Sequence, residues 1–203
     1  MLDRWWSSPP PDGPGYAAGM STAELLPDVT FEAFLAAEQD SERRHEWVAG
    51  RVYAMAGATE RHDLMVGLIY RKLAGLADAR GCRTFAHNRL VRLGDVAYYP
   101  DVLVVCPSDI KPDRLHELDL SIVVEVVSPS TEELDRREKA MAYTSAPSFE
   151  RYVVVDPDRR RIEVATRGPG GVHWELFSHG RVIFELELDV DALYDTLDAT
   201  ALT

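Results

Sequence analysis

The chain has 203 residues, of which 46% are hydrophobic and 28% charged, so it is long enough to bury a sizeable core and is not disordered or collagen-like as a whole. Asp and Glu number 34 against 22 Lys and Arg, which gives a formal net charge of -12 at pH 7. That balance excludes a generally basic protein that coats nucleic acid, although it leaves a local nucleic-acid site open.

Residues 1–20 are rich in Pro and Gly, and we expect them to form a disordered tail that precedes a single domain over 21–203. The first elements predicted after the tail are a helix over 30–39, a β-hairpin of 44–48 and 51–55, and a long helix over 59–79. Thr30 is the expected N-cap of the first helix, and Gly81 the expected end of the second.

The middle of the chain changes from helical patterns to strand patterns. The elements predicted there, in order, are one or two strands in 83–93, apolar strands at 102–106 and 121–127, a helix over 128–146, strands at 151–156, 161–166 and 172–177, and a short acidic helix over 191–197. Ser130 and Glu133 form a capping box at the start of the helix over 128–146. Unbroken apolar runs favour central strands that are covered on both faces. The pattern therefore predicts an α/β or α+β fold in which helices flank a mixed sheet.

The two cysteines, Cys82 and Cys106, form no CxxC pair and no cluster with the six histidines that has metal-ligand spacing. We therefore expect neither a disulfide framework nor a structural zinc site. No run approaches the roughly 18 apolar residues of a membrane span, and the N-terminus does not have the pattern of a signal peptide. These features predict a soluble cytoplasmic protein that does not bind membranes.

Two carboxylates lie in or beside the apolar strands. Glu125 interrupts the run IVVEVV, and a buried glutamate needs a cation, a metal or its own proton as a partner. Asp101 follows Pro100 directly before the run VLVVC. If the two strands are neighbours, both carboxylates converge, and two such oxygen donors suit Mg²⁺ or Mn²⁺ together with phosphate and water. The alternatives are that Asp101 closes a turn and that Glu125 belongs to a buried salt bridge.

The helix that follows Glu125 offers a cation. Asp135, Lys139 and Tyr143 are spaced at i, i+4 and i+8 and so lie along one side of this helix. One interpretation is an exposed pair of Asp135 and Lys139 that contributes only a few tenths of a kcal/mol. The other is that Lys139 points at the two carboxylates.

These residues occur in a recognisable order. The segments YYPD, VVEVVSPST, DRREKAMAY and YVVVDP together resemble the PD-(D/E)XK nuclease superfamily, and within it the restriction-endonuclease-like Uma-two family, over roughly residues 28–196. The resemblance implies a central mixed sheet flanked by helices, with an N-terminal helix and a β-hairpin. It also implies a catalytic site in which Asp101 and Glu125 bind Mg²⁺ or Mn²⁺. Val127 stands where the superfamily pattern has lysine, and the resemblance implies that Lys139 on the following helix takes that role.

The resemblance implies further site residues. Glu46 is similar to an early acidic residue of the family and would be a third metal ligand; otherwise it is a surface glutamate. His62 matches a histidine that would contact phosphate or metal, and the alternative is a structural role at a helix start. Tyr143, an accessory candidate, and Tyr152 match family aromatics that we assign to packing.

The function that follows from the resemblance is a magnesium-dependent endonuclease that hydrolyses DNA phosphodiester bonds. DNA is the expected partner, and a homodimer is expected because two sites would cut both strands of a duplex. Two alternatives stay open at this point: a catalytically silent binding or assembly protein with the same fold, and a metal-dependent hydrolase of a small phosphate compound.

Overall fold

The computed structural model describes residues 28–55, 57–106, 116–117, 120–128, 131–182 and 188–200. The expected tail over 1–20 and the Ser130 half of the capping box lie outside the described residues. Within the described part, no helix is both long and apolar enough to cross a membrane.

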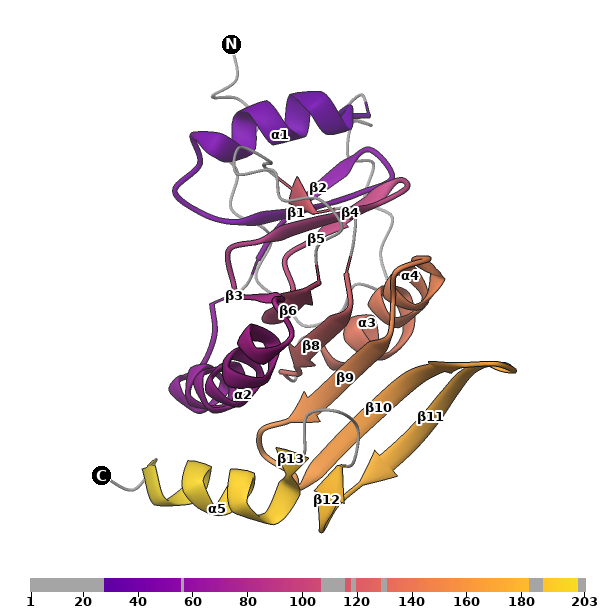
Figure 1. The fold of residues 1–203 in the computed structure, drawn as a ribbon. Coiled ribbons are helices and arrows are strands. Elements are labelled where there is room, and N and C mark those ends of the chain that lie inside the picture. Colours follow the sequence, from indigo (N-terminus) through magenta and orange to yellow (C-terminus); the bar gives the residue numbers. More distant parts are fainter. Residues whose placement is uncertain are drawn as a thin grey trace.

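The smaller of two main sheets lies beneath helix α1 (Phe31–Gln39) (Figure 1). Its strands, in the spatial order β2-β1-β5-β4-β7, are β2 (Arg51–Ala54), β1 (His45–Val48), β5 (Val96–Tyr98), β4 (Leu90–Leu93) and β7 (His116–Glu117). Strands β1 and β2 form the predicted hairpin through Ala49 and Gly50, which have φ angles of 46° and 83°. Two positive φ values match the right-handed twist of the paired strands.

The larger sheet has six strands among the described residues. In the spatial order β11-β10-β9-β8-β6-β3 they are β11 (Gly171–Phe177), β10 (Arg161–Gly168), β9 (Arg151–Asp156), β8 (Ile122–Val126), β6 (Val102–Val105) and β3 (Arg83–Ala86). Strands β8 and β9 are parallel, and the other neighbours are antiparallel. The two apolar runs are neighbouring strands, which is the condition for Asp101 and Glu125 to converge: β6 pairs with β8, and Val102 lies opposite Val124.

Helices cover both faces of the larger sheet (Figure 1). One face carries α2 (Glu60–Ala79) and α5 (Val190–Thr200); the other carries a continuous helical segment made of α3 (Glu132–Leu134), η1 (Asp135–Lys139) and α4 (Ala140–Ser145). Two short strands, β12 (Arg181–Val182) and β13 (Leu188–Asp189), pair beside α5. The α/β or α+β prediction, with helices flanking a mixed sheet, is confirmed.

The apolar strands contribute alternately to two cores. Val104 and Val124 pack with Met65 of α2 on one face, whereas Leu103 and Val123 belong to the core of the opposite face. Successive side chains of a strand point to opposite faces, so a strand covered on both sides needs an unbroken apolar run. This is why the two runs could be predicted as central strands.

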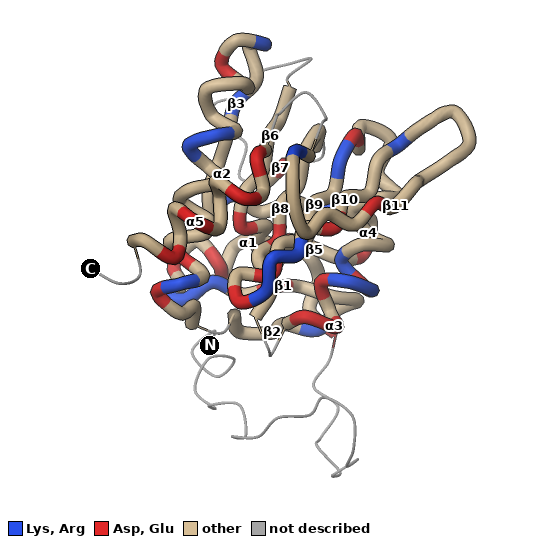
Figure 2. Tube along the Cα trace, turned by 90° about the horizontal axis from the view of Figure 1, so that it is seen from below, with Lys and Arg blue, Asp and Glu red and all other residues tan. Residues whose placement is uncertain are grey.

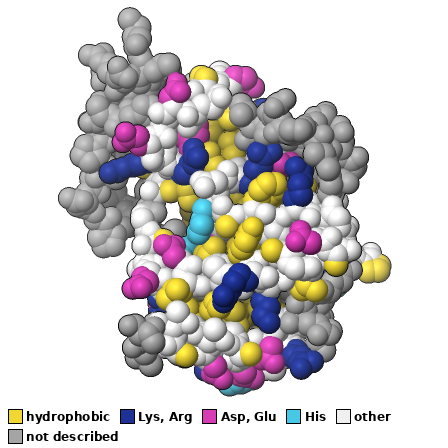
Figure 3. All heavy atoms as spheres, turned by 60° about the vertical axis from the view of Figure 1, so that its left-hand side comes forward, with side chains coloured by type: hydrophobic (Ala, Val, Ile, Leu, Met, Phe, Trp, Pro, Cys, Tyr) yellow, Lys and Arg dark blue, Asp and Glu magenta, His cyan; other side chains and the backbone are white. Residues whose placement is uncertain are grey.

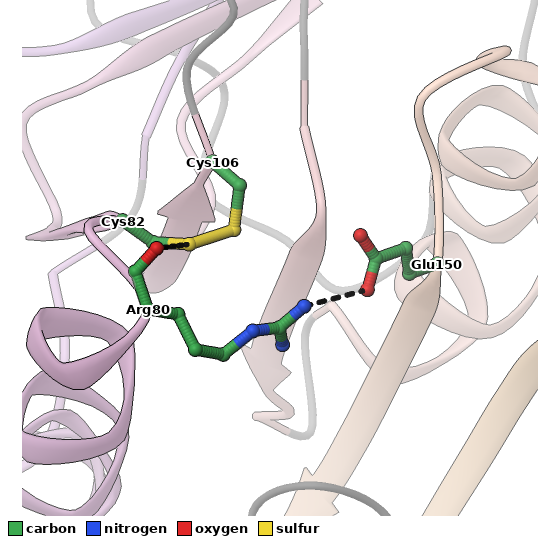
Figure 4. Close-up of a disulfide and its surroundings, with 4 residues drawn as sticks. All are labelled: Arg80, Cys82, Cys106 and Glu150. Atoms are coloured by element: carbon green, nitrogen blue, oxygen red, sulfur yellow. Dashed lines mark hydrogen bonds and ion pairs between the residues drawn. A yellow bond between two sulfur atoms is a disulfide. The ribbon is translucent and has the colours of Figure 1, made fainter.

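The expectation that the cysteines form no disulfide is wrong. Cys82 and Cys106 are joined by a disulfide beside Arg80 and Glu150 (Figure 4). Arg83 of β3 lies opposite Val105 of β6, so the two cysteines are the next opposed positions beyond that pair. Their proximity comes from strand register, for which their spacing of 24 residues gave no signal. Because disulfides persist mainly in oxidising compartments, the cysteines do not support the predicted cytoplasmic location.

Candidate active site

A single buried ammonium group lies where the two sheets and the helical segment meet. Lys139, at the end of η1, places its Nζ 2.9 Å from Glu46 Oε1, 3.3 Å from Asp135 Oδ1 and 3.4 Å from Glu125 Oε1. Glu46 comes from β1 of the smaller sheet and Glu125 from β8 of the larger one. The Lys139 side chain is only 6% exposed, so the interpretation of an exposed Asp–Lys pair does not hold.

Three carboxylates therefore share one ammonium. Burial raises the pKa of Glu125 well above its ordinary value, although Lys139 opposes the shift. Burial likewise raises the pKa of Glu46 and of Asp135 against the same opposing charge. Burial alone would lower the pKa of Lys139, but the three carboxylates raise it well above its ordinary value. The cluster has more negative than positive charge, and a proton or a further cation would stabilise it.

Asp101 lies beside this cluster, directly before β6. Its Oδ2 accepts a 2.7 Å hydrogen bond from the backbone N–H of Val126, the residue that follows Glu125. Asp101 also raises the pKa of Glu125, which places the two carboxylates within electrostatic reach of one another. The β6–β8 register thus brings the two acidic residues predicted as metal ligands to the same end of adjacent strands.

Two histidines contact Asp101. His62, in the first turn of α2, has its Nε2 3.4 Å from Asp101 Oδ2, and His87 has its Nδ1 3.5 Å from Asp101 Oδ1. Burial alone would raise the pKa of Asp101, but the two histidines hold it well below its ordinary value. Burial opposes the shift at His62, yet Asp101 raises the pKa of both His62 and His87.

His87 was missed by the sequence reasoning. It lies between β3 and β4, has a left-handed φ of 54°, and donates its backbone N–H to Asp101 O at 3.1 Å. Left-handed backbone is uncommon outside glycine, and nothing in the local pattern predicted it. Its role depends on the contact between the end of β3 and the start of β6, which the sequence alone does not reveal.

Aromatic residues close the cluster from the side of the helical segment. The hydroxyl of Tyr143 donates to Glu125 Oε1 at 3.1 Å, and that of Tyr152 donates to the Asp135 carbonyl oxygen at 2.8 Å. Lys139 Nζ lies 5.4 Å from the centre of the Tyr98 ring. Tyr143 and Tyr152 are fully buried, as expected of packing residues, and Tyr143 also bonds directly to a predicted site residue.

The donor chemistry of the site fits a divalent cation. Asp101 and Glu125 offer oxygen ligands, and the buried Glu46 Oε1 and Asp135 Oδ1 both lie beside the one Lys139 ammonium. No three His, Cys, Asp or Glu side chains of the described part lie close enough together to hold a metal ion by themselves. Mg²⁺ is commonly bound by one or two carboxylates and completes its coordination with water and substrate phosphate. Two carboxylates beside an excess of negative charge meet that requirement.

The chain is similar in sequence to one protein family and to two proteins of Synechocystis. A family model named Uma2, described as "Putative restriction endonuclease", matches residues 31–196. An uncharacterized Synechocystis protein, slr1290, is 28% identical over 162 residues, which cover 78% of this chain and 84% of that protein. A second uncharacterized Synechocystis protein, sll1609, is 23% identical over 148 residues, covering 71% and 82%.

One solved structure has a similar fold. It is an Anabaena variabilis protein described as "a putative nuclease belonging to DUF820", and it aligns with a TM-score of 0.70 over 83% of this chain and 99% of its own. The two sequences are 16% identical, so the likeness concerns the fold.

Proposed function

The chain belongs to the Uma2 family of restriction-endonuclease-like proteins, and on this premise we propose that it is a metal-dependent endonuclease that hydrolyses DNA phosphodiester bonds. One observation carries the proposal: Lys139, from the helical segment after β8, has its Nζ 3.4 Å from Glu125 and 2.9 Å from Glu46, where it would take the role of the lysine that Val127 replaces. If Lys139 only formed an exposed pair with Asp135 on the helix surface, its side chain would not be buried among three carboxylates.

The residues divide the chemistry among themselves. Asp101 and Glu125 would hold Mg²⁺ or Mn²⁺, and Glu46, which the resemblance suggested as a third ligand, would instead position the Lys139 ammonium. The bound cation supplies a water of lowered pKa and a polarised phosphate. Lys139, held by Glu46, donates hydrogen bonds to the attacking water or to the phosphate oxygens, which stabilises developing negative charge. His62 would keep Asp101 ionised and oriented. In-line attack of the water on the phosphorus would then leave a 5′-phosphate on the cleaved strand.

The surface supports local rather than general contact with DNA. Acidic and basic residues are interspersed over the elements (Figure 2). Several basic side chains are paired with acidic ones and so are less available to DNA phosphates: Arg136 lies 3.0 Å from Glu163, and Arg160 pairs with acidic residues of α5. On the face shown in Figure 3, Lys and Arg side chains lie above and below a histidine, among apolar side chains. We therefore expect weak DNA binding that depends on the metal and falls with salt.

The test is nicking of supercoiled plasmid with Mg²⁺ or Mn²⁺ and with EDTA. The wild type should nick only with metal, and Asp101→Asn and Lys139→Ala should each lose at least about a hundredfold in rate. Lys72→Ala, at an exposed position of α2, is the matched control and should keep full activity. An unchanged rate in Asp101→Asn would indicate a contaminating nuclease.

The same preparations separate the alternatives. DNA binding without cleavage in any metal would support a catalytically silent binding protein. Hydrolysis of bis(p-nitrophenyl) phosphate without plasmid cleavage would support a hydrolase of small phosphate compounds. Either result overturns the endonuclease proposal.

A further inference from the structure

Strand β11 carries an exposed apolar stripe at the edge of the larger sheet. Val172, Trp174 and Leu176 alternate along the strand and are 36%, 46% and 61% exposed. Figure 1 shows β11 as the outermost strand, and in Figure 2 the projecting end of the β10–β11 hairpin is free of Lys, Arg, Asp and Glu. A long edge strand with apolar side chains is a template for pairing with another strand.

The outer backbone edge of β11 is defined by the hairpin register. Gly168 pairs with Gly171 across a two-residue turn, so these two residues face each other across the hairpin. Consistently, the N–H of Arg167 points the other way and donates to Glu150 O at 3.1 Å, on the β9 side. By alternation, the backbone groups of Val172, Trp174 and Leu176 point outward. In the described part of the chain, β11 has β10 as its sole strand partner.

This edge is complementary to itself. When two β11 strands pair antiparallel about a two-fold axis at Trp174, Val172 lies opposite Leu176 of the second copy, and the two Trp174 residues meet. On the other face, His173 lies opposite Glu175 of the second copy, and this pair occurs twice. Moving the axis to Glu175 would oppose two Glu175 side chains, whose like charges disfavour the pairing, and moving it to His173 would lose both His173–Glu175 pairs. Charge complementarity therefore selects the register centred on Trp174.

We infer that β11 binds a second copy of this chain through this pairing, so that two six-stranded sheets join edge to edge. The interface is isologous, as a two-fold dimer requires. It closes an edge that would otherwise remain open to further strands.

The pairing also orients the two candidate sites. The Trp174 ring contacts Tyr152 with centroids 6.1 Å apart, Tyr152 contacts Tyr143 at 5.3 Å, and the Tyr143 hydroxyl donates to Glu125. The stripe and the carboxylates thus share one face of the sheet. Because the two-fold axis is perpendicular to the sheet, both sites lie on the same face of the dimer. Two sites on one face could act on the two strands of one DNA duplex, and only this consequence rests on the proposed function.

The experiment measures assembly and register without any activity assay. Sedimentation equilibrium of the full chain over micromolar concentrations should give twice the chain mass of 22.7 kDa. Trp174→Ala and Glu175→Lys should each raise the dimer dissociation constant about tenfold or more. Met141→Ala, which removes another exposed apolar side chain on α4, is the matched control and should not change it. Circular dichroism melting verifies that each variant folds.

Cysteine cross-linking tests the register. His173→Cys and Glu175→Cys, mixed as separate chains and oxidised, should form a covalent heterodimer, because opposed positions of this kind bring Cβ atoms within disulfide range. Each variant alone should cross-link much less. A monomeric wild type, a dimer that Trp174→Ala does not weaken, or a mixture without the 173–175 cross-link would overturn the inference. A monomer whose stripe is protected by added DNA would reassign the surface to nucleic acid.

Discussion

The stability of the cluster depends on one side chain. Lys139→Met keeps most of the side-chain volume but leaves Glu46, Glu125 and Asp135 buried without their shared cation. We expect a loss of about 3–5 kcal/mol in unfolding free energy at pH 7 in EDTA, because breaking a buried ion pair leaves uncompensated charge. Urea unfolding monitored by circular dichroism measures this.

The exposed Lys72 provides the comparison for this substitution. Lys72→Met should change stability by less than about 0.5 kcal/mol, as is usual for surface sites. An equally small effect of Lys139→Met would mean that the buried carboxylates are already protonated and do not need the ammonium.

The raised pKa of Glu125 predicts an unusual dependence of stability on pH. A carboxyl whose pKa is raised by folding binds protons more readily in the folded protein than in the unfolded chain. The unfolding free energy should therefore rise as pH falls through the raised pKa towards the ordinary value of 4.5. Asp101 acts in the opposite sense and only at lower pH: its stabilisation is lost as pH falls from its ordinary value of 3.8 through its lowered pKa.

Glu125→Gln separates these contributions. We expect the variant to be more stable than the wild type near neutral pH in EDTA. This advantage should disappear towards about pH 5, because the wild type gains stability as Glu125 is protonated whereas glutamine does not titrate. Thermal melts between pH 4.5 and 8 measure the difference, at roughly 2–4 °C per kcal/mol for a chain of this size. Parallel curves for both proteins would show that Glu125 stays ionised throughout.

At the scale of residues, the sequence predicted which residues belong to the site better than it predicted which residues each of them contacts. An acidic residue within an apolar strand required a partner, which made Glu125 predictable from physical chemistry. Asp135 was recognised only as a helical neighbour of Lys139, because its contact with the cluster needs the helical segment packed on the sheet. His87 could not be predicted, because its contact with Asp101 depends on a loop conformation rather than a periodic pattern.

At the scale of elements, most helices and strands followed from periodicity and capping. Thr30 caps α1 by accepting a hydrogen bond from the Ala33 N–H, and the positive φ of Gly81 follows the end of α2, as predicted. The helix after β8 differs from an ordinary α-helix, because Asp135–Lys139 form a π-helical turn. Such turns often occur at functional sites, and they follow from tertiary packing that a pattern of 3.6 residues does not report.

The disulfide connects two further elements and makes a measurable prediction. It joins the start of β3 to the end of β6, the strand that begins beside Asp101. The oxidised protein, unfolded in guanidinium, should contain no titratable thiol. Cys82→Ser with Cys106→Ser should lower the unfolding free energy by about 3 kcal/mol, since the bridge closes a loop of 24 residues.

Reduction gives the matched comparison. Dithiothreitol should lower the melting temperature of the wild type but not that of the double serine variant. Two free thiols in the protein as purified from a non-reducing buffer would contradict the bridge.

At the scale of the whole molecule, the net charge of -12 conceals local pairing. Asp191 and Asp195 of α5 pair with Arg160, and Asp198 lies 2.7 Å from Arg61 of α2. The acidic C-terminal helix therefore docks on basic residues. The carboxylates around Lys139 are different, because they outnumber the one ammonium they share; in the proposed function they are the groups that the DNA phosphate would approach.

A divalent cation should therefore increase DNA affinity through the site and not through bulk screening. Ca²⁺ takes the same oxygen ligands as Mg²⁺ with looser geometry, which makes it suitable for measuring binding. We expect Ca²⁺, compared with EDTA, to tighten wild-type binding of a fluorescent duplex about tenfold, or about 1.4 kcal/mol. Fluorescence anisotropy at constant ionic strength measures the difference. Raising NaCl should weaken binding in both conditions, since phosphate contacts depend on counterion release.

The comparison between two acidic residues decides where the cation acts. Asp101→Asn should lose most of the Ca²⁺-dependent gain, because it removes a proposed metal ligand and one of the charges that would repel phosphate. Glu133→Gln, at an exposed position of α3 paired with Arg137, changes the net charge equally and should keep the whole gain. If Ca²⁺ strengthened binding equally in both variants, the cation would be acting on the overall charge of the molecule, and the carboxylates of the site would have no special part in holding DNA.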